Sequence, residues 1–147
     1  MTLPYQTRAY ETWAPFVARV LFAGAFLMGA AFKIPGTEGF GMEAAMTAAA
    51  GFPFATVAVF LAFLLEVVGG IALLIGWKTR LFAFILALFV ALLAVVFYRD
   101  FSDPMTMGMF VSHLTFIAGL LYVSVYGAQH VAVKACPLPK DLVRTGV

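Results

Sequence analysis

Four long apolar stretches alternate with short segments rich in proline, glycine and charged residues. An apolar stretch of about 18 or more residues has the length of a transmembrane helix, because each residue advances a helix by about 1.5 Å and the hydrocarbon core is about 30 Å thick. The pattern therefore predicts an all-α membrane protein whose four transmembrane helices form an antiparallel bundle. We expect one integral membrane domain over residues 1–147, with a polar cytoplasmic tail at 127–147 and spans at about 16–34, 54–76, 81–98 and 105–126.

Residues 37–50 (TEGFGMEAAMTAAA) join the first two predicted spans and are too short, and too polar at their front, to cross a bilayer. Met42 and Met46 stand one helical turn apart, and Glu43 is expected to face water. We therefore expect a short helix that lies at the membrane interface or folds back onto the bundle. At the start of the first span, Pro15 is expected in the first helical turn, where its missing N–H has no partner to lose.

Hydrophobic residues make up 64% of the chain and charged residues only 11%, whereas a soluble domain carries about 25% charged residues. This composition indicates an integral membrane protein in contact with lipid. The net charge of +2 comes from scattered basic residues, so it gives no reason to expect a nucleic-acid site. The one cysteine, Cys136, excludes an internal disulfide and a CxxC motif for redox or zinc chemistry.

Basic residues are unevenly divided between the two ends of the predicted spans. Only Lys33 and Arg99 lie on the side that holds the 35–52 and 99–106 loops. The other side holds both termini and the turn at 77–80, with Arg8, Arg19, Lys78, Arg80, Lys134, Lys140 and Arg144. Since cytoplasmic segments carry the excess of Lys and Arg, we expect a multi-pass protein of a bacterial-type inner membrane with both termini in the cytoplasm.

Small residues recur at helical spacing within the predicted spans. Residues of this kind let the backbones of two transmembrane helices approach closely. We expect helix packing at six glycines, namely Gly24, Gly29, Gly69, Gly70, Gly108 and Gly119.

A single carboxylate, Glu66, lies near the middle of the second span. A charge at that depth costs about 2.5–3.5 kcal/mol on insertion scales, so we expect a compensating partner. Arg19 lies about 5 Å inside the first span, and its long side chain could reach toward Glu66. One interpretation is a buried Arg19–Glu66 ion pair that holds the bundle together. The other is that Glu66 relays protons or contacts a ligand.

His113 lies about 12 Å from the start of the fourth span, in an apolar setting with Ser112 beside it. Its imidazole could bond to a neighbouring helix, or form a hydrogen bond with a quinone-like or phenolic ligand. Lys33 and Arg99, at the ends of two other spans, either anchor the helices at the headgroups or join His113 around a pocket for an anionic or quinone headgroup. We therefore name Lys33, Arg99, Ser112 and His113 as the candidate ligand-binding residues.

Motifs of known catalytic and metal sites are missing from the sequence. There is no HExxH motif, carboxylate–histidine cluster, Ser-His-Asp arrangement, phosphate loop or dinucleotide fingerprint. We expect no metal site, no cofactor within the chain apart from a possible quinone or lipid, and no catalytic residue that the sequence can identify.

Several motifs resemble those of the DoxX family of small four-span membrane proteins. RVLFAG opens the first span at residues 19–24, GFP precedes the second at 51–53, and EVVGGIALLIGWKTR covers residues 66–80. The resemblance extends from residue 16 to about 127 and implies a four-helix membrane bundle that belongs to a membrane oxidoreductase complex. The family's namesake resembles a subunit of a thiosulfate:quinone oxidoreductase, but this sequence has no feature that marks sulfur chemistry.

Three functions are compatible with these observations. The first, which the resemblance implies, is a non-catalytic or quinone-contacting subunit of a larger membrane complex associated with electron transfer. The second is a small transporter, or a lipid- or quinone-binding protein, in which Glu66 serves as the coupling carboxylate. The third is a membrane scaffold or adaptor that binds other membrane proteins.

Overall fold

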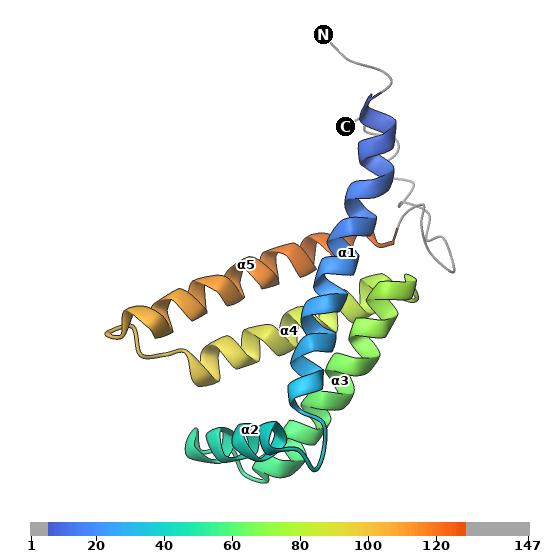
Figure 1. The fold of residues 1–147 in the computed structure, drawn as a ribbon. Helices are drawn as coiled ribbons and strands as arrows, with labels where there is room; N and C mark the ends of the chain where they lie inside the picture. Colours follow the sequence, from blue (N-terminus) through green and yellow to red (C-terminus); the bar gives the residue numbers. More distant parts are fainter. Residues whose placement is uncertain (1–5, 129–147) are drawn as a thin grey trace.

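The structure is a computed structural model that describes the backbone of residues 6–128 and the side chains from Trp13 onward. All regular secondary structure in this part of the chain is helical (Figure 1), with a short α2 between the first two long helices. The helices are α1 (Gln6–Phe32), α2 (Glu38–Ala49), α3 (Ala55–Ile75), α4 (Thr79–Phe97) and α5 (Pro104–Tyr126). Four of them are long and apolar enough to cross a membrane, which confirms the predicted fold class. The predicted tail from residue 129 onward lies outside the described residues.

The predicted spans and the observed helices agree closely except at the start of the first one. Helix α1 begins at Gln6, so Pro15 lies inside the helix rather than in its first turn. The apolar pattern placed the start too late because residues 6–15 are largely polar and carry no hydropathy signal. The apolar, membrane-length part of α1 runs from Trp13 to Phe32.

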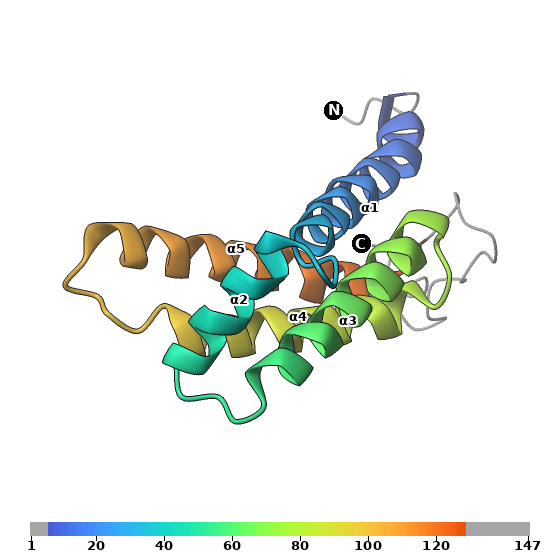
Figure 2. The same ribbon diagram turned by 60° about the horizontal axis from the view of Figure 1, so that its bottom comes forward.

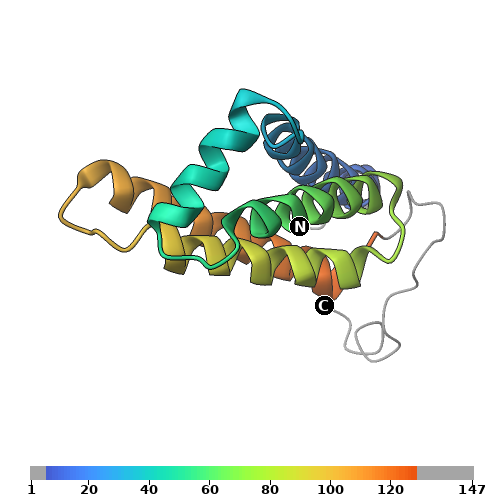
Figure 3. The ribbon, with the colours of Figure 1, turned by 90° about the horizontal axis from the view of Figure 1, so that it is seen from below.

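The four long helices are arranged as two antiparallel pairs that cross each other. Helix α1 packs along α3, and α4 packs along α5, as Figure 1 shows. The two pairs meet mainly through α3 and α4, while α1 touches α5 only briefly. Helix α2 runs from the end of α1 across the start of α3, toward the C-terminal part of α4 (Figures 2 and 3).

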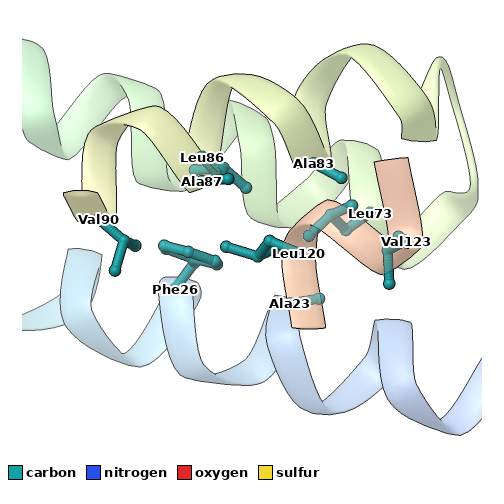
Figure 4. Packing of buried hydrophobic residues seen from close by; sticks show 9 residues of the cluster. All are labelled: Ala23, Phe26, Leu73, Ala83, Leu86, Ala87, Val90, Leu120 and Val123. Atoms are coloured by element: carbon teal, nitrogen blue, oxygen red, sulfur yellow. The ribbon is translucent and has the colours of Figure 1, made fainter. Parts of the chain in front are cut away.

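The buried core lies where the two helix pairs cross (Figure 4). All four long helices contribute to it, with Ala23, Phe26, Leu73, Ala83, Leu86, Ala87, Val90, Leu120 and Val123. Three of these residues are alanines, which let the crossing backbones come close while the leucines fill the space between them. Because lipid is as apolar as leucine, such close packing stabilises the crossing more than removal of surface from water does.

Four of the six glycines expected at helix contacts lie against another helix. A Cβ atom on Gly69 would stand 2.9 Å from Leu86 Cδ1, and one on Gly70 would stand 2.9 Å from Leu27 Cγ. A Cβ atom on Gly119 would lie still closer to a ring carbon of Phe22, and Gly29 faces the carboxylate of Glu66 on α3. The two other glycines, Gly24 and Gly108, do not follow the expectation, because open space lies beside them.

Candidate functional site

The carboxylate of Glu66 is paired with the ammonium of Lys33. The Lys33 Nζ atom lies 3.2 Å from both Glu66 Oε1 and Glu66 Oε2, and 3.4 Å from the carbonyl oxygen of Gly29. Only 6% of the Glu66 side chain and 14% of the Lys33 side chain are exposed. A Cβ atom on Gly29 would stand 3.4 Å from Glu66 Oε2, so the carboxylate lies against α1 at this glycine. Two buried charges thus compensate each other between α1 and α3.

The expectation that Arg19 is the partner of Glu66 therefore has to be corrected. Arg19 lies ten residues before Gly29 on α1, which is about 15 Å along a helix. The Arg19 side chain is buried, and its guanidinium carbon lies 5.8 Å from the ring centre of Phe16. The prediction of an Arg19–Glu66 pair was wrong because it assumed that the ends of α1 and α3 lie at the same depth in the membrane.

Helices α1 and α3 are in fact offset along their axes. Gly29 faces Glu66, and Leu27 faces Gly70. In this register the first two turns of α3 extend beyond the end of α1, so the middle of α3 comes level with the end of α1. Lys33, which had been interpreted as a headgroup anchor or a ligand contact, is therefore the cation next to Glu66.

A pocket of about 360 Å³ lies next to this ion pair. Helix α2 closes one side of it, and the first half of α3 and the second half of α4 form most of the apolar walls. Its polar groups come from five residues of different parts of the chain: Lys33, Glu43, Thr47, Tyr98 and His113. Its apolar walls are formed by Met46, Phe52, Ala58, Val59, Ala62, Phe89, Leu92, Leu93, Val96 and Phe97.

The structure brings only two of the four candidate ligand-binding residues together. Lys33 and His113 both line the pocket. Arg99 is exposed and does not line it. Ser112 is also exposed, and its hydroxyl donates back to the carbonyl oxygen of Gly108 at 2.9 Å. The expected pocket, lined jointly by Lys33, Arg99 and His113 for an anionic or quinone headgroup, is therefore formed without Arg99.

Sequence reasoning missed three polar residues of the pocket, namely Glu43, Thr47 and Tyr98. Glu43 was expected to face water, but it is half-buried and turned toward the pocket. A signal was available in the spacing of α2, because Glu43, Met46 and Thr47 follow the i, i+3, i+4 pattern of one helix face. The Met42–Met46 pair suggested a different face, and Met42 is in fact exposed.

Aromatic and hydroxyl groups shape the polar end of the pocket. The rings of Tyr98 and His113 lie with their centres 4.7 Å apart. Burial raises the pKa of the Tyr98 hydroxyl, and the nearby negative charge of Glu43 raises it further. Tyr98 is therefore a neutral phenol at physiological pH, able both to donate and to accept a hydrogen bond.

Within the part of the chain that the structure describes, no group of three or more His, Cys, Asp or Glu side chains is close enough to hold a metal ion. The pocket instead combines an apolar cavity with a few convergent polar groups. This is the usual composition of a small-molecule site. The arrangement can hold an amphiphilic molecule with its apolar part between α3 and α4 and its polar end near Glu43 and His113.

Comparison with known proteins gives two similarities. Residues 14–99 match the DoxX family. The chain is 32% identical over 111 residues to the inner membrane protein YqjF of Escherichia coli (strain K12), an alignment that covers 76% of this chain and 82% of that protein. No solved structure shows significant similarity to the chain.

Proposed function

This chain belongs to the DoxX family of membrane proteins, and on that premise we propose that it is a quinone-binding subunit of a redox-associated complex in the inner membrane. The quinone would occupy the pocket between α2, α3 and α4. The subunit itself would hold and orient the molecule rather than carry out the electron transfer.

The observation that carries this proposal is the pocket itself. Its walls belong to two membrane-length helices, so a molecule dissolved in the lipid is the kind of ligand that meets it. Its volume of about 360 Å³ is within the usual range for small-molecule sites, about 300–1,000 Å³. A quinone has a flat apolar ring with polar atoms at its rim. The lining of the pocket includes Phe89 and Phe97, which suit the ring, and Tyr98 and His113, which suit the polar atoms.

Membership of a complex is supported by the apolar surface that the two helix pairs leave uncovered. Helix α5 contacts α4 along its length but α1 only briefly. Large apolar side chains of α5 are therefore exposed, among them Met105, Met109, Leu114 and Leu121. Such a surface suits either lipid tails or the helices of another subunit.

A binding experiment tests the quinone site. The full chain in lipid nanodiscs is titrated with a short-chain ubiquinone, and binding is followed by equilibrium dialysis. We expect saturable binding that is lost in Ala62→Phe, because the new ring fills the pocket. Ala118→Phe is the matched control, since Ala118 is an exposed alanine of α5 outside the pocket. Binding that Ala62→Phe leaves unchanged would show that the quinone does not occupy this pocket.

A second experiment tests the complex. The chain is purified from its native membrane in a mild detergent and analysed by native electrophoresis with mass spectrometry. We expect a band well above the 15.9 kDa of the chain, with an oxidoreductase subunit as a stoichiometric component. Migration of the chain alone would contradict this part of the proposal.

We also propose that both termini are cytoplasmic, which places the pocket in the outer half of the membrane. The support is the excess of basic residues on the side of the termini and of the α3–α4 turn. Alkaline phosphatase fused after residue 102 is expected to be active, and the same enzyme fused after residue 78 inactive. The reverse pattern of activity would show that both termini lie on the outer side of the membrane.

A further inference from the structure

The hydrogen-bond donors that border the pocket are already occupied by protein groups. A lysine ammonium has three donor protons, and Lys33 faces three acceptors, namely the two carboxylate oxygens of Glu66 and the carbonyl oxygen of Gly29. The hydroxyl of Thr47 donates to the carbonyl oxygen of Glu43 at 2.7 Å. Neither side chain is left with a proton for a ligand.

The imidazole of His113 also has one of its nitrogens occupied by a protein group. Its Nδ1 atom lies 2.8 Å from the carbonyl oxygen of Met109. A carbonyl oxygen can only accept, so the proton of the neutral ring is on Nδ1, and Nε2 carries a lone pair. In this neutral form the histidine offers a ligand an acceptor, at Nε2, and not a donor.

The hydrogen-bonding groups of the pocket that are still available to a ligand are mostly acceptors. The carboxylate of Glu43 accepts only, and within residues 13–128 no side-chain or backbone donor bonds to it. The His113 Nε2 atom also accepts, and the Tyr98 hydroxyl is the one group that can do both. The charge of the pocket also favours a ligand that donates hydrogen bonds. Lys33 and Glu66 neutralise each other, so the carboxylate of Glu43 leaves the pocket negative.

From this inventory we infer that the pocket selects a ligand whose polar end donates hydrogen bonds, and that it binds a hydroquinone in preference to the corresponding quinone. This inference rests on the proposed function for the identity of the ring. A hydroquinone carries two hydroxyl donors, one for Glu43 and one for His113. A quinone carries only carbonyl acceptors, so it would leave both protein acceptors without partners and would bond at most to Tyr98.

Three probes of nearly the same shape test the inference. They are a short-chain ubiquinone, its two-electron-reduced hydroquinone and the dimethyl ether of that hydroquinone, each titrated against the full chain in nanodiscs. Two added hydrogen bonds should make the hydroquinone bind about tenfold more tightly than the quinone. The ether, which has no donor, should bind no better than the quinone. In a potentiometric titration the same tenfold preference raises the midpoint potential of the bound two-electron couple by about 30 mV.

Substitutions in the pocket show which protein groups cause the preference for the hydroquinone. Glu43→Gln replaces one acceptor oxygen with a donor, so we expect the hydroquinone preference to fall to about threefold while quinone affinity rises. His113→Phe keeps a ring beside Tyr98 but removes Nε2, and a similar fall is expected. Glu38→Gln is the matched control, because Glu38 is on α2 outside the pocket lining. The ratio of two affinities is measured on each variant, so a general loss of folded protein does not change it.

The outcomes separate the inference from the proposed function. If none of the three probes binds, the proposed function fails. If quinone and hydroquinone bind equally, or if the ether binds as well as the hydroquinone, the quinone site stands and the donor preference is overturned. If the preference is present but unchanged in both Glu43→Gln and His113→Phe, the assignment to these acceptors is overturned.

Discussion

Lys33, at the end of α1, holds both carboxylate oxygens of Glu66 in the middle of α3, each at a distance of 3.2 Å. The contact is possible because α3 is offset along α1, which brings Glu66 level with Gly29, one helical turn before Lys33. The pair lies beside the pocket and uses all the donor protons of Lys33. It therefore joins two helices and also makes the pocket poor in donors.

Removal of one partner of this pair should destabilise the protein strongly. Lys33→Met leaves the Glu66 charge buried without its ammonium, and we expect a loss of about 3–5 kcal/mol in the free energy of unfolding. The double variant Lys33→Met/Glu66→Met should recover part of that loss, because no uncompensated charge remains. Unfolding in mixed detergent micelles, followed by circular dichroism, measures both.

A double-mutant cycle with Arg19 serves as the control for this assignment. Arg19→Met and Glu66→Met should add within about 0.5 kcal/mol, because the two sites share no contact. A coupling energy for Arg19 and Glu66 that exceeds the one for Lys33 and Glu66 would mean that the partner has been assigned wrongly.

Glycines at the helix crossings should be intolerant of larger residues, whereas exposed glycines should accept them. Gly69→Val places side-chain atoms where Leu86 lies, and overpacking of this kind costs about 1–3 kcal/mol. Gly24→Val is the matched control, because open space lies beside Gly24. Thermal denaturation of both variants in nanodiscs decides the point, and equal midpoints would contradict the observed packing.

The position of α2 should depend on Gly39. A Cβ atom on this residue would collide with the carbonyl oxygen of Phe32, so Gly39→Ala has to move α2 away from the end of α1. Because α2 closes one side of the pocket, we expect weaker quinone binding, by about tenfold if the shift costs about 1.4 kcal/mol. Gly41→Ala, where nothing lies within contact distance, should bind like the unmodified protein.

The start of α5 should be sensitive to acid. Asp103 caps the helix by accepting from Met105 N and Thr106 N, and the hydrogen bonds from Thr106 hold the pKa of its carboxyl below the usual value. Since the pKa is lower in the folded state, the stabilisation is present above the unfolded pKa and is lost as the pH falls through the folded pKa. We expect faster amide hydrogen exchange at Met105 and Thr106 in acid, beyond the intrinsic pH dependence of exchange.

Asp103→Asn is the control for this pH effect. An asparagine also caps a helix start but does not titrate in this range. Its amide exchange, corrected for the intrinsic rate, should therefore stay constant while that of the unmodified chain rises. The same acid dependence in both proteins would assign the effect to another group.

Several properties of this protein follow from the sequence alone. Hydropathy and residue counts place four membrane spans and the short helix between them, because bilayer thickness sets the length of an apolar helix. The cost of a charge inside the membrane also singles out Glu66 as a residue that needs a partner. The motif at residues 66–80 leads to the correct family.

Which residues meet across the helices depends on how the helices pack, and this is visible only in the three-dimensional structure. The hydropathy pattern gives the length of α1 and α3 but not their offset, so it could not choose between Arg19 and Lys33 as the partner of Glu66. It also could not show that α2 turns Glu43 and Thr47 inward, because a rotation of α2 by half a turn about its own axis exchanges its buried and exposed faces. These are relations between helices, fixed by the fit of Gly29, Gly69 and Gly70 against their neighbours rather than by any periodicity within one helix.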